Sequence, residues 1–431
     1  MDRTVATEAP RERAVLVAAP LKEVSSGEAT EHLEELGRLI DTAGGEVVGT
    51  LRQRLDSPHP KFFIGEGKVG ELRELVQATA AGLVVFDEEL SPAQGKNLED
   101  ALKTRIVDRA ELILDIFATR ARSAEAQMQV ELAQLQYMLP RLKRMWTHLS
   151  RIRGGIGFRG PGETQLETDR RLISKRIQDL RDKLDVVARR RATQRRGRER
   201  EFRASLVGYT NAGKSSILAA MSGAELFVED RLFATLDPST RVVDVGGGTK
   251  VLMTDTVGFI RKLPHNLVAS FRATLEEARE ADVLLHVIDA AHPTWLEQKQ
   301  VVDDVLTELE LRDVRTLLVF NKIDRLTHGE EEELRQRVLA IFDEPAVFVS
   351  AQTEHGLDPL RQRLLEEVRE GRPEVHLRIP SADGETIAAI YRAGEVLQRD
   401  EEGATVGLVA RLPKAVVGKL RRRDGVTVSG A

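Results

Sequence analysis

The sequence contains a phosphate-loop pattern, G-x-x-x-x-G-K-[ST], between residues 208 and 215. The pattern is formed by Gly208, Tyr209, Thr210, Asn211, Ala212, Gly213, Lys214 and Ser215. Such a loop has to join a strand to a helix, because its backbone N–H groups converge on phosphates at the start of that helix. The apolar run 204–207 supplies the strand. The motif therefore predicts a doubly wound parallel sheet with a phosphate-binding site.

Three further motifs follow in the order expected for a guanine-nucleotide site. They are Asp255, Thr256, Val257 and Gly258; Asn321, Lys322, Ile323 and Asp324; and Ser350, Ala351 and Gln352. We expect Asp324 to accept hydrogen bonds from the guanine N1–H and 2-amino groups, since adenine lacks both donors. An unpaired carboxylate there would cost about 1–3 kcal/mol or more, so GTP is expected to be preferred over ATP. The last motif is expected to close over the base with backbone N–H groups.

The positions within these motifs assign a role to each polar group. Lys214 is expected to place its charge on the β and γ oxygens, and Ser215 to offer a hydroxyl to Mg²⁺. Asp255 ends an apolar run and is expected to bind Mg²⁺ through water, while the Gly258 N–H meets the γ-phosphate.

A mobile threonine is also needed to cap Mg²⁺ and to sense the γ-phosphate. The expected segment contains Phe233, Ala234, Thr235, Leu236 and Asp237, and Thr235 is the candidate, with Thr240 as the alternative. The predicted catalytic residues are thus Lys214, Thr235 and Gly258, and the predicted Mg²⁺ ligands are Ser215, Thr235 and Asp255. Because loops ordered by the γ-phosphate are a recurrent switch, residues 228–248 and 255–270 are expected to move. The glycines at 246–248 indicate a hairpin turn.

Position 259 lacks the glutamine with which Ras-like enzymes orient the attacking water. Phe259 occupies that position, and a phenyl ring cannot hold water by hydrogen bonding. Intrinsic hydrolysis is therefore expected to be slow until a partner, another loop or an ion completes the site. Asn211 resembles the position that binds K⁺ in potassium-activated GTPases, so K⁺ is a second candidate cofactor.

Composition restricts the remaining classes of protein. The chain has 431 residues and no cysteine, which excludes disulfides and thiolate metal sites and fits a reducing cytoplasm. Lys and Arg number 64 against 69 Asp and Glu, so only local clustering favours nucleic-acid binding. Because there is no basic leader and no apolar run of 18 residues, we expect a cytoplasmic protein without an integral membrane segment.

Hydrophobic patterning predicts a multidomain α/β protein with four domains. They are an N-terminal α/β domain (1–120), a long antiparallel helical hairpin with a glycine-rich tip (121–200), a doubly wound P-loop GTPase domain (201–372) and a small C-terminal α+β domain (373–431). The N-terminal strands are predicted at 14–21, 46–51, 83–86 and 112–118, with helices over 28–43, after residue 68 and from Pro92. Later strands are predicted at 204–207, 250–254, 283–288, 316–320, 346–349, 375–379 and 405–410, with a helix near 385–391.

Two coiled-coil-like seams predict the hairpin. Apolar residues recur at spacings of four and three in two stretches: Met128, Leu132, Leu135, Leu139, Leu142 and Trp146, then Ile173, Ile177, Leu180, Leu184 and Val187. Residues 153–163 are too glycine-rich for a helix and are expected to form a flexible tip. Pro140 is expected to kink or interrupt the first helix.

The whole chain resembles the HflX family, GTPases related to Obg that associate with the large ribosomal subunit. Beyond the nucleotide motifs, the resemblance rests on residues 62–68 (FFIGEGK), 108–117 (DRAELILDIF), 133–142 (AQLQYMLPRL) and 160–163 (GPGE). It implies a factor that binds the 50S subunit and its rRNA, splits stalled or idle 70S ribosomes, and is released as a monomer when GTP is hydrolysed to GDP. The family is also linked to ATP binding in the N-terminal domain. Residues 65–68 lack full phosphate-loop spacing, however, and we interpret them as a helix-start turn.

Basic residues clustered on the hairpin favour RNA phosphates as a partner. They are Arg141, Lys143, Arg144, Arg151, Arg153, Arg159, Arg170, Arg171, Lys175, Arg176, Arg189, Arg190, Arg191, Arg195 and Arg196. A solvated helix surface paired with its own carboxylates explains such a cluster about equally well. The alternative function is a regulatory GTPase that acts on a protein or membrane target without binding ribosomes.

Overall fold

The chain forms two compact units. The computed structural model describes residues 11–142, 161–195, 201–223, 231–246, 248–264, 267 and 278–430. One unit comprises residues 1–185, 230–236 and 262–271, and the other comprises residues 186–229, 237–261 and 272–431. Two short segments of the nucleotide region therefore belong to the N-terminal unit, and the boundaries of the four predicted domains stay predictions.

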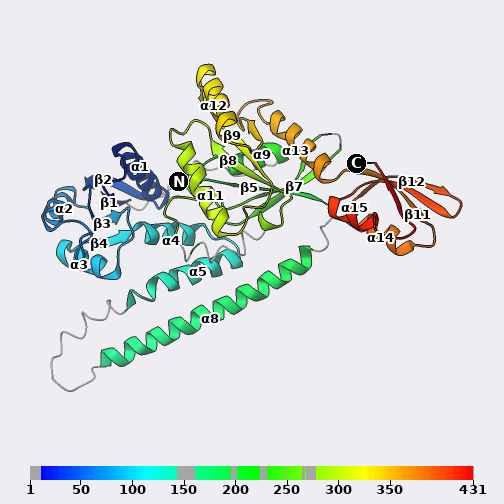
Figure 1. Cartoon of the computed structure of the whole chain (residues 1–431). Coiled ribbons are helices and arrows are strands. Elements are labelled where there is room, and N and C mark those ends of the chain that lie inside the picture. Colours follow the sequence, from blue (N-terminus) through cyan, green and yellow to red (C-terminus); the bar gives the residue numbers. More distant parts are fainter. Residues whose placement is uncertain are drawn as a thin grey trace, which may run out of the picture. The chain divides into compact units, whose positions relative to one another are not determined.

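The N-terminal unit contains a four-stranded parallel sheet with the order β2-β1-β3-β4 (Figure 1). Its strands are β1 (Glu12–Ala18), β2 (Gly45–Arg52), β3 (Leu83–Phe86) and β4 (Arg105–Asp108), and its helices are α1 (Ser26–Thr42), α2 (Glu66–Thr79), α3 (Pro92–Leu102) and α4 (Arg109–Arg120). Capping boxes at Ser25 and Ser91 begin α1 and α3. The sheet confirms the predicted α/β class of this region.

The strand predicted over residues 112–118 is wrong, because these residues lie within α4. The Asp108 side chain accepts a hydrogen bond from the Glu111 N–H at 2.9 Å and caps the helix. Leu112, Ile116 and other apolar residues of α4 are buried. A short apolar run fits a buried strand and a buried helix equally well, and here the cap decides. The fourth strand is instead β4, which the patterning missed.

The helical hairpin consists of α5 (Ala124–Met138) and α8 (Pro161–Arg195), which lie side by side and run in opposite directions (Figure 1). Leu132, Ile177 and Leu180 form the buried centre of their seam. This packing confirms the seam for the described residues, whereas Trp146 and the rest of 143–160 lie outside them. The first helix ends before Pro140, as expected, while residues 161–163 belong to α8 and not to the tip.

The second unit contains a six-stranded sheet with the order β10-β9-β8-β5-β7-β6. Its strands are β5 (Phe202–Gly208), β6 (Ser239–Asp244), β7 (Lys250–Asp255), β8 (Val283–Asp289), β9 (Thr316–Asn321) and β10 (Ala346–Phe348). The helices are α9 (Lys214–Ser222), α11 (Trp295–Glu308), the 3₁₀ helix η2 (Ile323–Arg325), α12 (His328–Ile341) and α13 (Asp358–Gly371). Only β6 pairs antiparallel, through the hairpin predicted at 246–248, where Thr249 N–H donates to Gly246 O at 3.1 Å. The doubly wound sheet is confirmed.

The C-terminal module is an antiparallel sheet with the order β12-β13-β11-β14. It contains β11 (Glu374–Pro380), α14 (Gly384–Ala393), β12 (Glu395–Glu402), β13 (Thr405–Arg411), α15 (Lys414–Leu420) and β14 (Thr427–Ser429). Its buried core includes Leu377, Ile390 and Leu408, which confirms an α+β module. Among the described helices of the chain, none has the length and apolar character needed to cross a membrane.

Candidate nucleotide site

The phosphate loop joins β5 to α9, and its geometry requires glycine at both ends. Gly208 and Gly213 have φ angles of 150° and 96°. A Cβ at Gly208 would collide with the carbonyl oxygen of Val287, and one at Gly213 with the side-chain nitrogen of Asn321. Only glycine can adopt these φ angles and leave room for the atoms of β8 and β9 that lie against the loop. Contacts with these two strands therefore fix the shape of the phosphate loop.

Lys214 lies buried at the start of α9, within the phosphate loop. Its Nζ donates to the carbonyl oxygens of Gly208 at 3.1 Å and Tyr209 at 2.9 Å. Burial lowers the pKa of Lys214 to about 8, and the Asp255 carboxylate opposes this shift. A buried ammonium with a lowered pKa gains from a neighbouring anion, and phosphate would supply one.

Ser215 and Asp255 form the candidate magnesium site. The Ser215 hydroxyl donates to Asp255 Oδ2 at 2.6 Å, and Asp255 is 2% exposed at the end of β7. Hydroxyl and carboxylate oxygens are ligands that suit Mg²⁺, which takes few protein ligands and completes its shell with phosphates and water. Among the described residues, no group of three or more His, Cys, Asp or Glu side chains is placed to hold a metal ion. When bound, Mg²⁺ would neutralise charge that develops on the phosphates.

The Asp-x-x-Gly loop is tied to the phosphate loop by backbone hydrogen bonds. Thr210 N–H donates to Phe259 O at 2.6 Å, and Phe259 N–H donates to Gly208 O at 3.1 Å. A Cβ at Gly258 would lie 2.8 Å from Thr210 Cα and 3.1 Å from Lys214 Nζ, which explains the glycine. The Phe259 ring is buried, so this position presents no polar side chain for orienting water.

Side chains of the Asn-Lys-x-Asp loop donate hydrogen bonds to the backbone of the phosphate loop. Asn321 Nδ2 donates to Ala212 O at 3.0 Å. Lys322, at φ 67°, donates from Nζ to Asn211 O at 2.8 Å and to Asp289 Oδ2 at 2.7 Å. Sequence analysis missed Asp289, although an aspartate that ends the neighbouring parallel strand β8 could have suggested it.

Asp324 is held in place by the last motif. Ser350 Oγ donates to Asp324 Oδ1 at 2.5 Å and accepts the Gln352 N–H at 3.1 Å. Ala351 N–H donates to Asn321 Oδ1 at 3.2 Å, so the two loops are joined directly. The Asp324 carboxylate is exposed yet oriented, as a group that reads a nucleobase has to be.

Thr235 lies in residues 230–236, which belong to the N-terminal unit, whereas Asp237 and the other nucleotide motifs belong to the second unit. The catalytic and metal-binding role of Thr235 stays a prediction. The alternative, Thr240, lies in β6 with its hydroxyl 2.9 Å from that of Thr254, which is a strand position and not a mobile loop. Residues 228–230, 247, 265–266 and 268–270 of the regions predicted to move lie outside the described residues.

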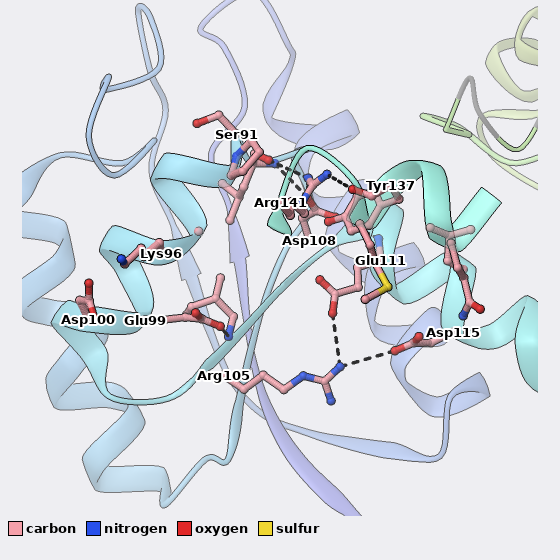
Figure 2. A pocket seen from close by; sticks show the side chains of 17 residues that line it. Ser91, Lys96, Glu99, Asp100, Arg105, Asp108, Glu111, Asp115, Tyr137 and Arg141 are labelled. Atoms are coloured by element: carbon pink, nitrogen blue, oxygen red, sulfur yellow. Dashed lines mark hydrogen bonds and ion pairs between the residues drawn. The ribbon is translucent and has the colours of Figure 1, made fainter. Parts of the chain in front are cut away.

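The N-terminal unit contains a cavity of about 480 Å³ between α3, β4, α4 and α5 (Figure 2). Its lining includes five carboxylates, from Glu99, Asp100, Asp108, Glu111 and Asp115, and three cations, from Lys96, Arg105 and Arg141. This excess of carboxylates does not favour a triphosphate. The 65–68 segment does not line the cavity, and α2 begins at Glu66, as expected for a helix-start turn.

A mostly parallel sheet whose strands lead into a phosphate loop, an Asp-x-x-Gly loop and an Asn-Lys-x-Asp loop defines a GTP-binding P-loop protein. Comparisons with known proteins agree: residues 30–118 match the family described as GTP-binding GTPase N-terminal, residues 120–198 match GTP-binding GTPase Middle Region, and residues 203–322 match 50S ribosome-binding GTPase.

Individual relatives extend this similarity over nearly the whole chain. GTPase HflX of Magnetococcus marinus is 44% identical over 423 residues, covering 97% of both chains. GTPase HflX of Escherichia coli is 45% identical over 391 residues, covering 89% of this chain and 90% of the relative. The solved SsGBP and GDP complex is 25% identical with a TM-score of 0.48, covering 82% of this chain and 98% of that one. The chain belongs to the HflX family and is a GTPase.

Proposed function

We propose that this GTPase binds the large ribosomal subunit and separates stalled or idle 70S ribosomes into subunits, with GTP hydrolysis releasing the factor. The observation that carries the proposal is the match of residues 203–322 to the family described as 50S ribosome-binding GTPase. The family membership of the whole chain supports it. A cytoplasmic monomer off the ribosome fits the same cycle.

Exposed cations on α8 are the proposed contacts with rRNA. Arg170, Arg171 and Lys175 are exposed on this helix. Arg176 is engaged differently, since it binds Glu131 of α5 through hydrogen bonds of 2.7 and 2.8 Å. The side chains of Lys143, Arg144, Arg151, Arg153, Arg159, Arg190, Arg191, Arg195 and Arg196 lie outside the described residues. Cations that contact phosphates make binding fall with rising salt.

Cosedimentation with purified 50S subunits tests this partner. We expect the protein to bind 50S subunits in the presence of a non-hydrolysable GTP analogue, to bind less in the presence of GDP, and to dissociate at high salt. Replacing Arg170, Arg171 and Lys175 by alanine should weaken binding and reduce its salt dependence. The matched control replaces Lys419, Arg421 and Arg422, three exposed cations of the C-terminal module. Absence of salt-sensitive binding by the unmodified chain would refute the ribosome partner and favour a regulatory GTPase that acts on a protein or membrane.

Incubation with intact 70S particles tests the activity. We expect separate 30S and 50S peaks on a sucrose gradient with GTP or its analogue, and none with the Lys214→Ala variant. Ribosomes should also accelerate GTP turnover, because the buried phenyl ring of Phe259 cannot orient water from this position. Binding without subunit separation would support a ribosome-associated GTPase that has another role.

For the hydrolytic step, we propose Ser215, Thr235 and Asp255 as the Mg²⁺ ligands and Asn211 as a contact to K⁺. The carbonyl oxygen of Asn211 already accepts the Lys322 ammonium at 2.8 Å, so this corner of the loop stabilises a positive charge. Turnover should be faster in KCl than in NaCl at equal ionic strength, and the Asn211→Ala variant should remove the difference. Equal turnover rates of the unmodified chain in KCl and NaCl would exclude K⁺ as a cofactor.

A further inference from the structure

Two short segments of the nucleotide region are held by the N-terminal unit. Residues 230–236 precede β6 and residues 262–271 follow the Asp-x-x-Gly loop, yet both belong to the unit of residues 1–185. Each has a residue with left-handed backbone, Phe233 at φ 56° and Lys262 at φ 54°. This conformation costs a non-glycine residue about 1–2 kcal/mol, so side-chain contacts have to offset it.

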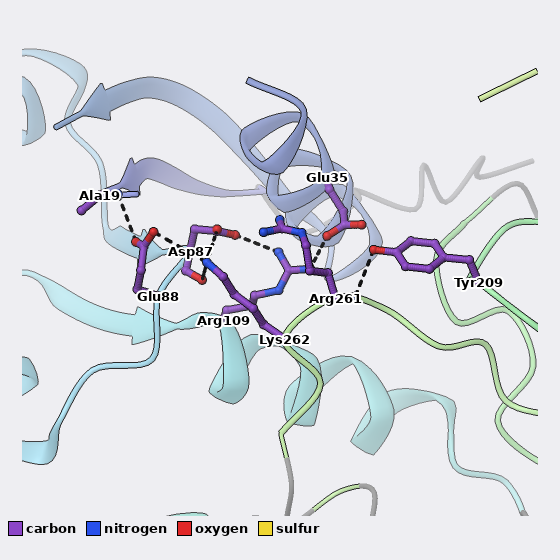
Figure 3. Close-up of polar contacts among 8 residues, drawn as sticks. All are labelled: Ala19, Glu35, Asp87, Glu88, Arg109, Tyr209, Arg261 and Lys262. Atoms are coloured by element: carbon purple, nitrogen blue, oxygen red, sulfur yellow. Dashed lines mark hydrogen bonds and ion pairs between the residues drawn. The ribbon is translucent and has the colours of Figure 1, made fainter. Parts of the chain in front are cut away.

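Lys262 forms an ion pair at the carboxyl end of β3 (Figure 3). Its Nζ lies 2.7 Å from Asp87 Oδ2, 3.2 Å from the Asp87 carbonyl oxygen and 3.7 Å from Glu88 Oε1. The Asp87 side chain is 2% exposed, whereas that of Lys262 is 40% exposed. Burial raises the pKa of Glu88, and Lys262 opposes that rise. The lysine therefore brings a positive charge to carboxylates that are largely withdrawn from water.

Asp87 also binds a second cation, Arg109, at the start of α4. The Arg109 side chain is 1% exposed, and its Nη1 donates to Asp87 Oδ1 at 2.8 Å, while Nη2 donates to Glu35 of α1 (Figure 3). Two cations, Lys262 and Arg109, and three carboxylates, Asp87, Glu88 and Glu35, thus form one mostly buried cluster. Displacing one member leaves the charges of the others less compensated. A movement of Lys262 therefore changes the forces on α1, β3 and α4.

Phe233 contacts α4 at a different turn. Its ring packs edge-to-face on Phe117, with centroids 4.5 Å apart and an interplanar angle of 79°. Both rings are buried. Such a pair contributes about 0.5–1.5 kcal/mol beyond the burial of area. Both segments are therefore linked to α4. Phe233 contacts Phe117 of this helix directly, and Lys262 is linked to its Arg109 through Asp87.

In the sequence, Phe233 and Lys262 each lie close to a residue that is predicted to bind the nucleotide or that contacts the phosphate loop. Phe233 lies two residues before Thr235. Lys262 directly follows Arg261, whose backbone N–H donates to the hydroxyl of Tyr209 in the phosphate loop at 3.0 Å (Figure 3). A rearrangement that carries Phe233 or Lys262 with it would break the contact that this residue makes in the N-terminal unit.

We propose that the Lys262–Asp87 ion pair and the Phe233–Phe117 contact form a latch that GTP binding has to open. The latch regulates the GTPase site, and the inference rests on the roles proposed for these segments there and not on the ribosome partner. Its closure favours GDP over GTP, because only the γ-phosphate requires the segments to rearrange. The cluster around Asp87 transmits the nucleotide state to the N-terminal unit.

The Lys262→Ala variant tests the latch in the full-length chain without ribosomes. We expect the affinity for GMPPNP relative to that for GDP to rise about fivefold or more, measured by competition with a fluorescent GDP. Lys262→Arg should keep the unmodified ratio because it retains the charge. Lys22→Ala is the matched control, since it removes an exposed lysine that pairs with Asp56 at 2.8 Å in the same unit. An unchanged ratio in Lys262→Ala, or a shift towards GDP, would overturn the proposal.

Hydrogen exchange supplies a second readout that nucleotide affinity does not determine. In the unmodified chain, amides of residues 83–87 and of α4 should exchange at different rates with GDP and GMPPNP, and Lys262→Ala should reduce that difference. In an Asp87→Asn background that still unfolds cooperatively, Lys262→Ala should have little further effect on the affinity ratio. If the exchange difference persists unchanged in Lys262→Ala, the ion pair does not transmit the nucleotide state. Failure of ribosome binding would leave both measurements interpretable.

Discussion

Replacing Asp324 by asparagine tests the guanine assignment with little risk to the fold. The carboxylate is exposed and accepts a hydrogen bond from Ser350 Oγ at 2.5 Å, and the amide oxygen of an asparagine can accept the same bond. The variant should therefore unfold within a few degrees of the unmodified chain. What changes is chemical: an asparagine amide donates where the carboxylate accepts from the guanine N1–H and 2-amino groups.

The loss follows from two hydrogen bonds to a charged acceptor. At about 1.5–3 kcal/mol each, they amount to about 3–6 kcal/mol, or about 10²- to 10⁴-fold weaker GTP binding. Xanthine carries a carbonyl oxygen in place of the 2-amino group, so it can accept from the new amide. XTP binding should correspondingly improve.

Isothermal titration of GTP, XTP and ATP into both proteins measures this exchange. Ser350→Ala is the graded control: it removes only the hydroxyl that orients Asp324 and should weaken GTP binding by about 0.5–1.5 kcal/mol. The reasoning fails if Asp324→Asn binds GTP as tightly as the unmodified chain, or if GTP binding is lost without any gain for XTP while the fold is intact.

Three further predictions concern the phosphate side of the site. Ser215→Ala removes the hydroxyl 2.6 Å from Asp255 and should raise the Mg²⁺ concentration needed for GTP binding about tenfold or more, as a magnesium titration would show. Burial lowers the Lys214 pKa to about 8, so the unliganded lysine loses its proton above that pH, and GTP affinity should fall from about pH 8 upward in fluorescence titrations. Lys214→Gln, though a weak binder, should lack that pH dependence. Gly258→Ala places a methyl group 2.8 Å from Thr210 Cα and should reduce GTP affinity about tenfold, while Gly67→Ala, with open space around it, should not.

Hydrophobic patterning and capping residues predicted most of the long helices and strands, including α1, α3, β8 and β9. Patterning failed at α4, because the apolar run 112–118 carries no period that separates a buried strand from a buried helix. It also missed β12, where five of the eight residues are charged. That strand pairs with β13 at the edge of its sheet, a position that tolerates polar residues.

Motif spacing predicted which residues to expect in the nucleotide site, but not the hydrogen bonds that join the motifs to one another. The bonds from Lys322 to Asn211 and Asp289 depend on the order of the strands, which no local pattern encodes. Likewise, a glycine at 213 is predictable from the motif, yet its physical cause is the side chain of Asn321 on another strand. The grouping of residues 230–236 and 262–271 with the N-terminal unit gave no signal in the sequence.

The bracing of the phosphate loop by Asn321 and Lys322 has a consequence for genetics. Both side chains bond to carbonyl oxygens of the loop, at Ala212 and Asn211. A substitution at Asn321 should therefore weaken the binding of the phosphates as well as of the base, and lower the affinities for GDP and GTP alike. Alleles at position 321 would fall in the same phenotypic class as alleles of the phosphate loop, whereas alleles at Asp324 would form a class of their own, defined by which base is accepted.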